Sequence, residues 1–376
     1  MDFARGETQQ AVAGLAARVL DQGGSPGATG ARGADESSYD SALWKELGQA
    51  GLLSLALPAW LGGDGLGVLD TATALTEVGR RAAPVPALAT LVLGVLPVVR
   101  WGDRDLQQAL LAGVAAGDTV LTAAVREPSD PMPAVPATTA KVRDGAGAAL
   151  SHGEGTVSGV KIGVPYAAAA DWILVPASFA GGGTGIVIVD PSDAGVFLTP
   201  GHSSGAAPEY TLRLDAAPVR HVLAAGGPGR AVADLYQLAI AGACCLADGA
   251  LAAALALTTA HVRSREQFGR PLAAFQAVAQ QIADVYIVSR TLHLATLSAC
   301  WRLEAGREAG EDLDVAAYWL ATRAPAALRA CHHLHGGMGM DVSYPLHRYS
   351  SVVRDLVRFV GGADYRLGRL GAGVGD

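Results

Sequence analysis

One apolar stretch in the second half of the chain constrains the fold more than any other feature. Residues 231–265 read AVADLYQLAIAGACCLADGALAAALALTTAHVRSR, which is rich in Ala and Leu and nearly free of charge. Alanine and leucine are strong helix formers, and a helix that is apolar on almost every side must be covered by other elements. We therefore predict one long buried helix, against which the rest of its domain packs.

Three further helical patterns follow it, over residues 273–306, 313–337 and from 344 onward. Four such helices in succession predict a C-terminal four-helix bundle, to which we assign residues 226–376. Residues 1–118 are also helical in pattern, and their apolar periodic segments end at Gly or Pro, as in LDTATALTEVGRRAAP.

The segment between these two helical regions, residues 119–225, has a different character. Short runs rich in β-branched residues, such as DWILVPA and TGIVIVD, are separated by Gly, Pro, Asp and Ser. This pattern predicts an antiparallel β domain. The predicted fold class is therefore α+β, with an N-terminal helical domain, a central β domain and a C-terminal bundle.

Composition narrows the class of protein. Half of the residues are hydrophobic and 17% are charged, which favours a large folded core over disorder. With a net charge of −7 and no basic run, nucleic acid is not an expected partner. The apolar stretch Leu88–Val99 is too short for a membrane span, and no signal peptide is evident, so we expect no membrane partner. None of the four cysteines forms a CxxC pair, which indicates a reduced, cytoplasmic protein.

Three blocks carry chemistry-bearing residues at characteristic spacings. They are RSREQFGRPLAAFQAVAQQIADVY (263–286), HLHGGMGMDVSYPLHRYSSVVRD (333–355) and GTVSGVKIGVPYAAAADWILVPA (155–177). In this order, and within this order of domains, the blocks resemble the acyl-CoA dehydrogenase family over essentially the whole chain. The resemblance implies α,β-dehydrogenation of an acyl-CoA thioester, in which a carboxylate removes the α-proton and FAD accepts the β-hydride.

The first block implies contacts to the cofactor. By resemblance, Arg265 lies at the FAD pyrophosphate, Phe268 packs near the adenine and Gln276 donates or accepts a hydrogen bond to the cofactor. A guanidinium fork suits two phosphate oxygens. In the family these groups reach across a subunit interface to the neighbour's FAD. The alternatives are a surface arginine beside a helix break, a core phenylalanine and a solvated glutamine.

The second block implies a backbone contact to the adenine end of FAD. Gly336 and Gly337 allow close approach of a ligand to the backbone, and His333 stands where the family has Gln and can still donate a hydrogen bond. The alternative is a simple helix break. The histidines at 332, 333 and 335 lack an acidic or cysteine partner at ligand spacing, so we expect no metal.

The residues expected at the redox end of the cofactor depart from the family pattern. Gly361 falls where the family's catalytic glutamate stands, and a glycine cannot accept a proton. If the alignment of this segment were shifted by three residues, Asp364 would stand at the position of the catalytic base instead. Some members place the base on the first bundle helix, where this chain has Ala239 at the aligned position and otherwise only Asp234 and Asp248; we expect Asp248 to make an interhelical or subunit contact.

The β domain departs in the same way. Gly163, Val164 and Pro165 replace the family's Trp-Ile-Thr beside the flavin, and a proline has neither a hydroxyl nor an N–H to donate. The loop Arg126–Ala134 keeps only Glu127 and Pro128 of the family's pattern.

The residues that depart from the family pattern are those expected at the reactive end of the chain's own flavin. The residues that are retained are those expected at the adenine and pyrophosphate end of a neighbouring subunit's flavin. We therefore hypothesise that this chain is the subunit without a catalytic base in an α2β2 acyl-CoA dehydrogenase. The second subunit of that assembly holds most of the FAD. Some bacterial α2β2 members act on bulky thioesters such as steroid side chains. Two alternatives stay open, a homo-oligomeric flavoenzyme with a different base or substrate, and a non-enzymatic scaffold of the same fold.

Overall fold

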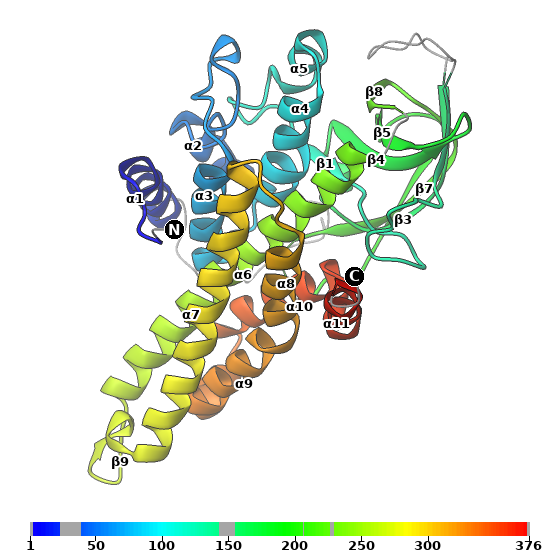
Figure 1. Cartoon of the computed structure of the whole chain (residues 1–376). Coiled ribbons are helices and arrows are strands. Elements are labelled where there is room, and N and C mark those ends of the chain that lie inside the picture. The colour runs from blue at the N-terminus through cyan, green and yellow to red at the C-terminus, as the bar shows by residue number, and fades with distance from the viewer. Residues whose placement is uncertain (1–2, 23–38, 143–154, 206, 226–228, 374–376) are drawn as a thin grey trace.

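The computed structural model describes residues 3–22, 39–142, 155–205, 207–225 and 229–373. Figure 1 shows helices at both ends of the chain packed side by side, with the sheet to one side of them. The long helix α6 (Arg230–Ser264) runs through the middle of the molecule and contacts helices of both halves.

The N-terminal helices form where the sequence supplies caps and apolar faces. Asp40 caps the helix that begins at Ser41, because its carboxylate accepts a hydrogen bond from Leu43 N at 3.0 Å. Asp103 caps the helix that begins at Arg104 in the same way, through Leu106 N at 2.9 Å. The helices of this region are α1 (Glu7–Gln22), α2 (Ser41–Gln49), α3 (Val68–Arg81), the π-helical segment η2 (Leu88–Val95), α4 (Leu96–Trp101) and α5 (Arg104–Leu111).

The sheet is mixed rather than wholly antiparallel. Its strands are β1 (Leu121–Ala123), β2 (Thr139–Val142), β3 (Gly155–Pro165), β4 (Trp172–Phe179), β5 (Thr184–Val189), β6 (Val196–Pro200), β7 (Glu209–Pro218) and β8 (His221–Ala224). They are ordered β6-β7-β3-β2-β4-β5-β8, with β1 also paired to β4. The expected antiparallel pairing holds except that β1 and β2 both run parallel to β4.

The C-terminal helices confirm the predicted bundle, with two differences: the third predicted helix is divided in two, and a further helix, α11 (Gly362–Gly373), follows the fourth. These helices are α6, α7 (Gln276–Glu304), α8 (Gly310–Thr322), α9 (Ala324–His335), α10 (Leu346–Phe359) and α11. The pattern over 313–337 predicted one helix, but the chain forms two, α8 and α9. Pro325 lies in the first turn of α9, and it has no N–H with which to continue a helix from α8.

Helix α6 is the buried helix that its composition predicts. By length and composition it could cross a membrane, but 78% of its most apolar window is buried inside the protein. Its apolar surface is covered by α3, α7, α9 and α10. This burial identifies α6 as the central core helix.

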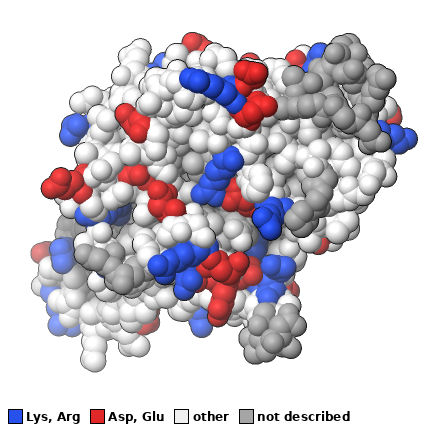
Figure 2. Space-filling view, turned by 45° about the horizontal axis from the view of Figure 1, so that its top comes forward, with Lys and Arg blue, Asp and Glu red and all other residues white. Residues whose placement is uncertain are grey.

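Charge is distributed without a dominant sign on the surface that Figure 2 displays. Basic and acidic side chains are interspersed over that face, and the described residues form no continuous basic area there.

The α+β class and the order of helices, sheet and helices agree with the sequence prediction, whereas the domain boundaries at residues 118 and 225 stay predictions.

Candidate functional site

The first block of the sequence forms a hairpin at the far end of the bundle. Arg265 is the C-cap of α6, strands β9 (Glu266–Gln267) and β10 (Arg270–Pro271) pair around the turn, and Gln276 begins α7. Figure 1 shows this hairpin projecting beyond the other elements. Arg265 and Gln276 are exposed, and Phe268 at the turn is 90% exposed. The alternative of a core phenylalanine is therefore excluded.

The second block lies at the same end of the molecule. Helix α9 ends at His335, and the buried ring of His335 stacks on the ring of His261 with centroids 4.5 Å apart. His261 lies in α6, one helical turn before Arg265. His333, Gly336 and Gly337 are exposed. The structure thus brings the two predicted cofactor motifs to neighbouring ends of α6 and α9.

The glycine turn after α9 leaves its backbone accessible. A Cβ added at Gly336 or at Gly337 would meet no atom within 4 Å. Gly336 also ends the helix with φ of 58°, so the helix break considered above is real. The two interpretations are compatible, because the turn that ends the helix is also the segment whose backbone a ligand could approach.

The neighbouring histidines are held by protein atoms. His332 bonds through Nδ1 to Gly339 O at 2.8 Å and through Nε2 to Ser350 Oγ at 2.6 Å. His335 bonds through Nδ1 to Cys331 O at 2.8 Å and through Nε2 to Tyr344 Oη at 3.0 Å. Burial lowers the pKa of His335, which favours the neutral ring. Both rings therefore shape the turn.

A second region lies between the sheet and the bundle, where the resemblance puts the redox end of the cofactor. Gly163 interrupts β3 with a bulge at φ of 59°. A Cβ there would lie 2.6 Å from Nη1 of Arg126, so this guanidinium occupies the space beside the strand. Val164 points into the sheet core and is 1% exposed, and Pro165 O accepts a hydrogen bond from Thr122 Oγ1 at 2.7 Å.

Glu127, which the altered loop retains, has a partner inside the protein. Its Oε1 accepts hydrogen bonds from Lys161 Nζ at 2.8 Å, Thr138 Oγ1 at 2.7 Å and Thr138 N at 3.0 Å. The Lys161 side chain is fully buried, and burial lowers its pKa to about 8 against the opposing effect of Glu127. Glu127 therefore anchors the loop to β3, which makes its role here structural.

The cleft in this region has a volume of about 110 Å³ and is lined by the end of α3, by Gly163 and Pro165, by residues of the loop between β6 and β7, and by α10. Ionic contacts tie that loop to α10. Asp355 accepts hydrogen bonds from Ser204 N at 2.7 Å and Gly205 N at 2.6 Å, while Arg358 pairs with Glu209 at 2.9 Å. Burial raises the pKa of Glu209 despite the nearby Arg358.

Gly361, which the sequence analysis aligns with the family's glutamate, lies in a tight turn between α10 and α11. Its φ is 92°, and an added Cβ would lie 2.7 Å from Cδ1 of Tyr365 and 2.8 Å from Cγ of Pro131. Real Cβ atoms essentially never come this close to other heavy atoms. Asp364, the register alternative, is exposed in the first turn of α11.

The carboxylates of α6 are engaged elsewhere. Asp248 accepts a hydrogen bond from His293 Nδ1 of α7 at 2.8 Å, which is the interhelical contact expected of it. Asp234 pairs with Arg100 at 2.5 Å and accepts from Trp101 Nε1 at 2.9 Å. Leu246 lines the cleft described above, whereas Asp248 lines a different pocket.

Sequence reasoning missed the polar cluster of Arg126, Glu209, Asp355 and Arg358. One signal was available, because Arg126 precedes the retained Glu127-Pro128 pair where the family has Thr. That difference marks Arg126 as unusual, but it does not indicate the contact with Gly163, which is 37 positions away in the sequence. Nothing in the sequence linked either residue to Glu209.

Comparison with known proteins gives one family. The model of the acyl-CoA dehydrogenase N-terminal domain matches residues 6–118, and that of the C-terminal domain matches residues 235–369. Acyl-CoA dehydrogenase FadE28 of Mycobacterium tuberculosis is 43% identical over 99% of this chain and 98% of its own length. The solved Tcur3481-Tcur3483 steroid ACAD is 34% identical with a TM-score of 0.89, covering 98% of both chains. The ChsE4-ChsE5 complex from Mycobacterium tuberculosis is 32% identical with a TM-score of 0.88, covering 100% of this chain and 99% of the other.

Proposed function

This chain belongs to the acyl-CoA dehydrogenase family, whose cofactor is FAD, and we propose that it is the subunit without a catalytic base in a two-subunit member. In that assembly a second acyl-CoA dehydrogenase subunit holds most of the FAD and supplies the carboxylate. The substrate class is an acyl-CoA thioester with a bulky acyl group, for which the steroid ACAD among the solved relatives is the support. FAD supplies the hydride acceptor.

The observation that carries the proposal is the position of the cofactor motif. Arg265, Phe268 and Gln276 lie on an exposed hairpin at the end of the bundle, and Phe268 is 90% exposed. Large apolar side chains that project into solvent are typical of contact surfaces. Groups so placed are suited to a cofactor presented by another subunit.

The surface of α7 next to the hairpin supports a subunit contact. Tyr286 is 58% exposed and Ile287 is 56% exposed, and both lie on the first half of α7. Met340 and Val342, which follow the glycine turn, are each 81% exposed. This end of the bundle thus combines the motif residues with apolar surface of the kind that subunit interfaces bury.

The cleft between sheet and bundle supports the loss of the redox role. Arg126 fills the space beside Gly163, and the position aligned with the glutamate has no room for a side chain. On this proposal, the work of this chain is to hold the pyrophosphate and adenine end of the partner's FAD through Arg265, Gln276 and the backbone at Gly336 and Gly337.

The test is FAD affinity in the complex co-expressed with a catalytic family member. Arg265→Ala removes charge-assisted hydrogen bonds to phosphate and should weaken FAD binding about 10- to 100-fold, measured by flavin fluorescence titration of the apo complex. Arg263→Ala is the matched control, since Arg263 is exposed in the last turn of the same helix. Equal FAD affinity in both variants would refute the role of Arg265.

A second candidate function rests on Glu209. Its carboxyl group lines the cleft, and burial raises its pKa, as suits a proton acceptor. In a homo-oligomeric flavoenzyme, Glu209 would then replace the missing glutamate.

Purification of the chain alone separates the two functions. A yellow homo-oligomer with FAD equimolar to polypeptide, whose dehydrogenase activity disappears in Glu209→Gln, would support the homo-oligomer. A colourless chain that gains flavin only with its partner supports the two-subunit enzyme.

A further inference from the structure

A stacked pair of histidines joins the two segments that carry the cofactor motifs. Arg265 follows α6, and the glycine turn at Gly336 and Gly337 follows α9. The ring of His335 stacks on the ring of His261, with centroids 4.5 Å apart and an angle of 20° between the ring planes. His261 lies one helical turn before Arg265, and His335 directly precedes Gly336. The stack therefore connects the two motifs at the helix ends from which they project.

Hydrogen bonds fix the ring of His335 relative to the glycine turn. Its Nδ1 donates to Cys331 O at 2.8 Å, so that Nε2 of the neutral ring is an acceptor, and Tyr344 Oη donates to it at 3.0 Å. Burial lowers the pKa of His335, which favours this neutral form. Tyr344 lies between the turn and the start of α10, so its bond to His335 spans the turn.

His261 contributes only its ring surface to this contact. Its imidazole makes no hydrogen bond within the described part of the chain, and it is half-buried. Its backbone carbonyl accepts hydrogen bonds from Arg265 N at 2.9 Å and from Ser264 Oγ at 3.2 Å, which ties the start of the hairpin to the same residue. A change of the His261 side chain therefore removes the stack and leaves these bonds in place.

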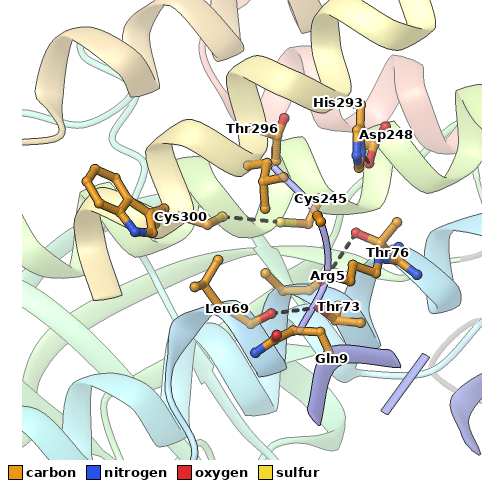
Figure 3. Close-up of a pocket in the computed structure, with 14 residues that line it drawn as sticks. Arg5, Gln9, Leu69, Thr73, Thr76, Cys245, Asp248, His293, Thr296 and Cys300 are labelled. Carbon is orange, nitrogen blue, oxygen red and sulfur yellow. Dashed lines mark hydrogen bonds and ion pairs between the residues drawn. The ribbon is translucent and has the colours of Figure 1, made fainter. Parts of the chain in front are cut away.

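Another histidine joins α6 to a neighbouring helix, but far from the motifs. Figure 3 shows His293 of α7 beside Asp248 of α6 at one side of a pocket between α1, α3, α6 and α7, where Nδ1 of the ring bonds to the carboxylate at 2.8 Å. Asp248 lies more than four helical turns before Arg265, about 25 Å along the helix axis. This pair offers a control for the loss of an interhelical histidine contact.

We propose that His261 and His335 are positioning residues for FAD, which hold the Arg265 hairpin and the glycine turn at a fixed separation so that both contact one cofactor together. This inference rests on the two-subunit function proposed above. Two contacts made from one rigid support reinforce each other, because the first contact places the second at a high effective concentration. Without the stack, the hairpin and the turn move independently and hold FAD less tightly.

The test measures FAD affinity by flavin fluorescence titration of the apo complex with the partner subunit. His261→Ala removes the stack, keeps the hydrogen bonds of His335 and introduces a strong helix former, so the fold is retained. It should weaken FAD binding about 3- to 10-fold, the range expected for the loss of an aromatic pair. His261→Phe restores a ring at this position and should recover most of the affinity.

His293→Ala is the control. It leaves the buried carboxylate of Asp248 without its partner, so it should lower the Tm of the complex while FAD affinity stays at the wild-type value. A double-mutant cycle then tests positioning directly. The combined loss in His261→Ala with Arg265→Ala should be smaller than the product of the two single losses, because a hairpin without its guanidinium gains little from being held in place.

The outcomes separate this inference from the two-subunit proposal. Equal FAD affinity in the wild type and Arg265→Ala would overturn both. A loss in Arg265→Ala together with wild-type affinity in His261→Ala would overturn only the positioning role. The positioning role would also be overturned by three other results: a double variant whose loss equals the product of the single losses, a His261→Phe variant that binds FAD no better than His261→Ala, or an equal loss in His293→Ala.

Discussion

The position aligned with the family's glutamate can be probed by its steric environment. Gly361 and Gly362 are adjacent, and both have positive φ, of 92° and 82°. A Cβ at Gly362 would meet nothing within 4 Å, whereas one at Gly361 would lie 2.7 Å from Tyr365 and 2.8 Å from Pro131. Gly362→Ala therefore measures the backbone cost alone, and Gly361→Ala measures the backbone cost together with the steric clash.

The magnitudes follow from these two contributions. Left-handed backbone costs a residue with a Cβ about 1–2 kcal/mol, so Gly362→Ala should lower the free energy of unfolding by that amount. Overpacking adds about 1–3 kcal/mol, so Gly361→Ala should cost about 2–5 kcal/mol. Relief by movement is restricted, because Pro131 is a rigid ring and Tyr365 is hydrogen-bonded to Asp130.

The assay is urea unfolding of both variants and the wild type, followed by circular dichroism under identical conditions. The reasoning fails if Gly361→Ala is no less stable than Gly362→Ala. In that case the turn could accept a side chain, and the argument that no glutamate fits at residue 361 in this backbone would be lost.

Three other predictions concern groups outside that turn. Lys161→Met leaves Glu127 buried without its cation and should destabilise the protein by about 3–5 kcal/mol in urea unfolding, whereas Lys161→Met with Glu127→Gln should cost less. The four thiols should react with an aromatic disulfide reagent only after denaturation, since all four are buried and since the hydrogen bond with Cys300, together with burial, raises the pKa of Cys245; rapid reaction of the native protein would contradict this. Asp355→Ala removes the acceptor for two backbone N–H groups, so limited proteolysis should cut faster within residues 201–208 than in the wild type.

The helices and the order of domains could be predicted because their signals are local. The uncharged composition of residues 231–265 required a buried helix, and α6 is that helix. The break between α8 and α9 was missed because the apolar pattern continues through Pro325, and pattern alone does not weigh one proline against a long periodic run. The parallel pairing of β1 and β2 with β4 was missed because strand pairing depends on contacts between distant segments.

The candidate site could be predicted only where residues act within one segment. Arg265, Phe268 and Gln276 lie in one short motif, so their common location followed from the sequence. The proximity of Arg126 to Gly163 joins residues 37 positions apart on different elements, and neither residue alone indicates the other. The environment of Phe268 was equally undetermined, since an aromatic residue in a motif can be buried or exposed.

Phe268 also carries an argument about why the hairpin has its present form. Its φ is 54°, a conformation that costs a non-glycine residue about 1–2 kcal/mol. Its ring is 90% exposed, so this chain also forgoes the roughly 1.5–3 kcal/mol that burial of a phenylalanine provides. Within the chain the ring contacts Phe275 edge-on, with centroids 6.1 Å apart, which compensates for little of either cost. Gly269, the next residue, holds the other left-handed position of the turn, with φ of 77°, and a glycine at residue 268 would hold this one without strain, so the aromatic side chain is not there to form the turn. A strained, exposed aromatic residue beside an exposed arginine is best explained by a surface that becomes buried when a second subunit binds, and this is the arrangement that the two-subunit proposal requires.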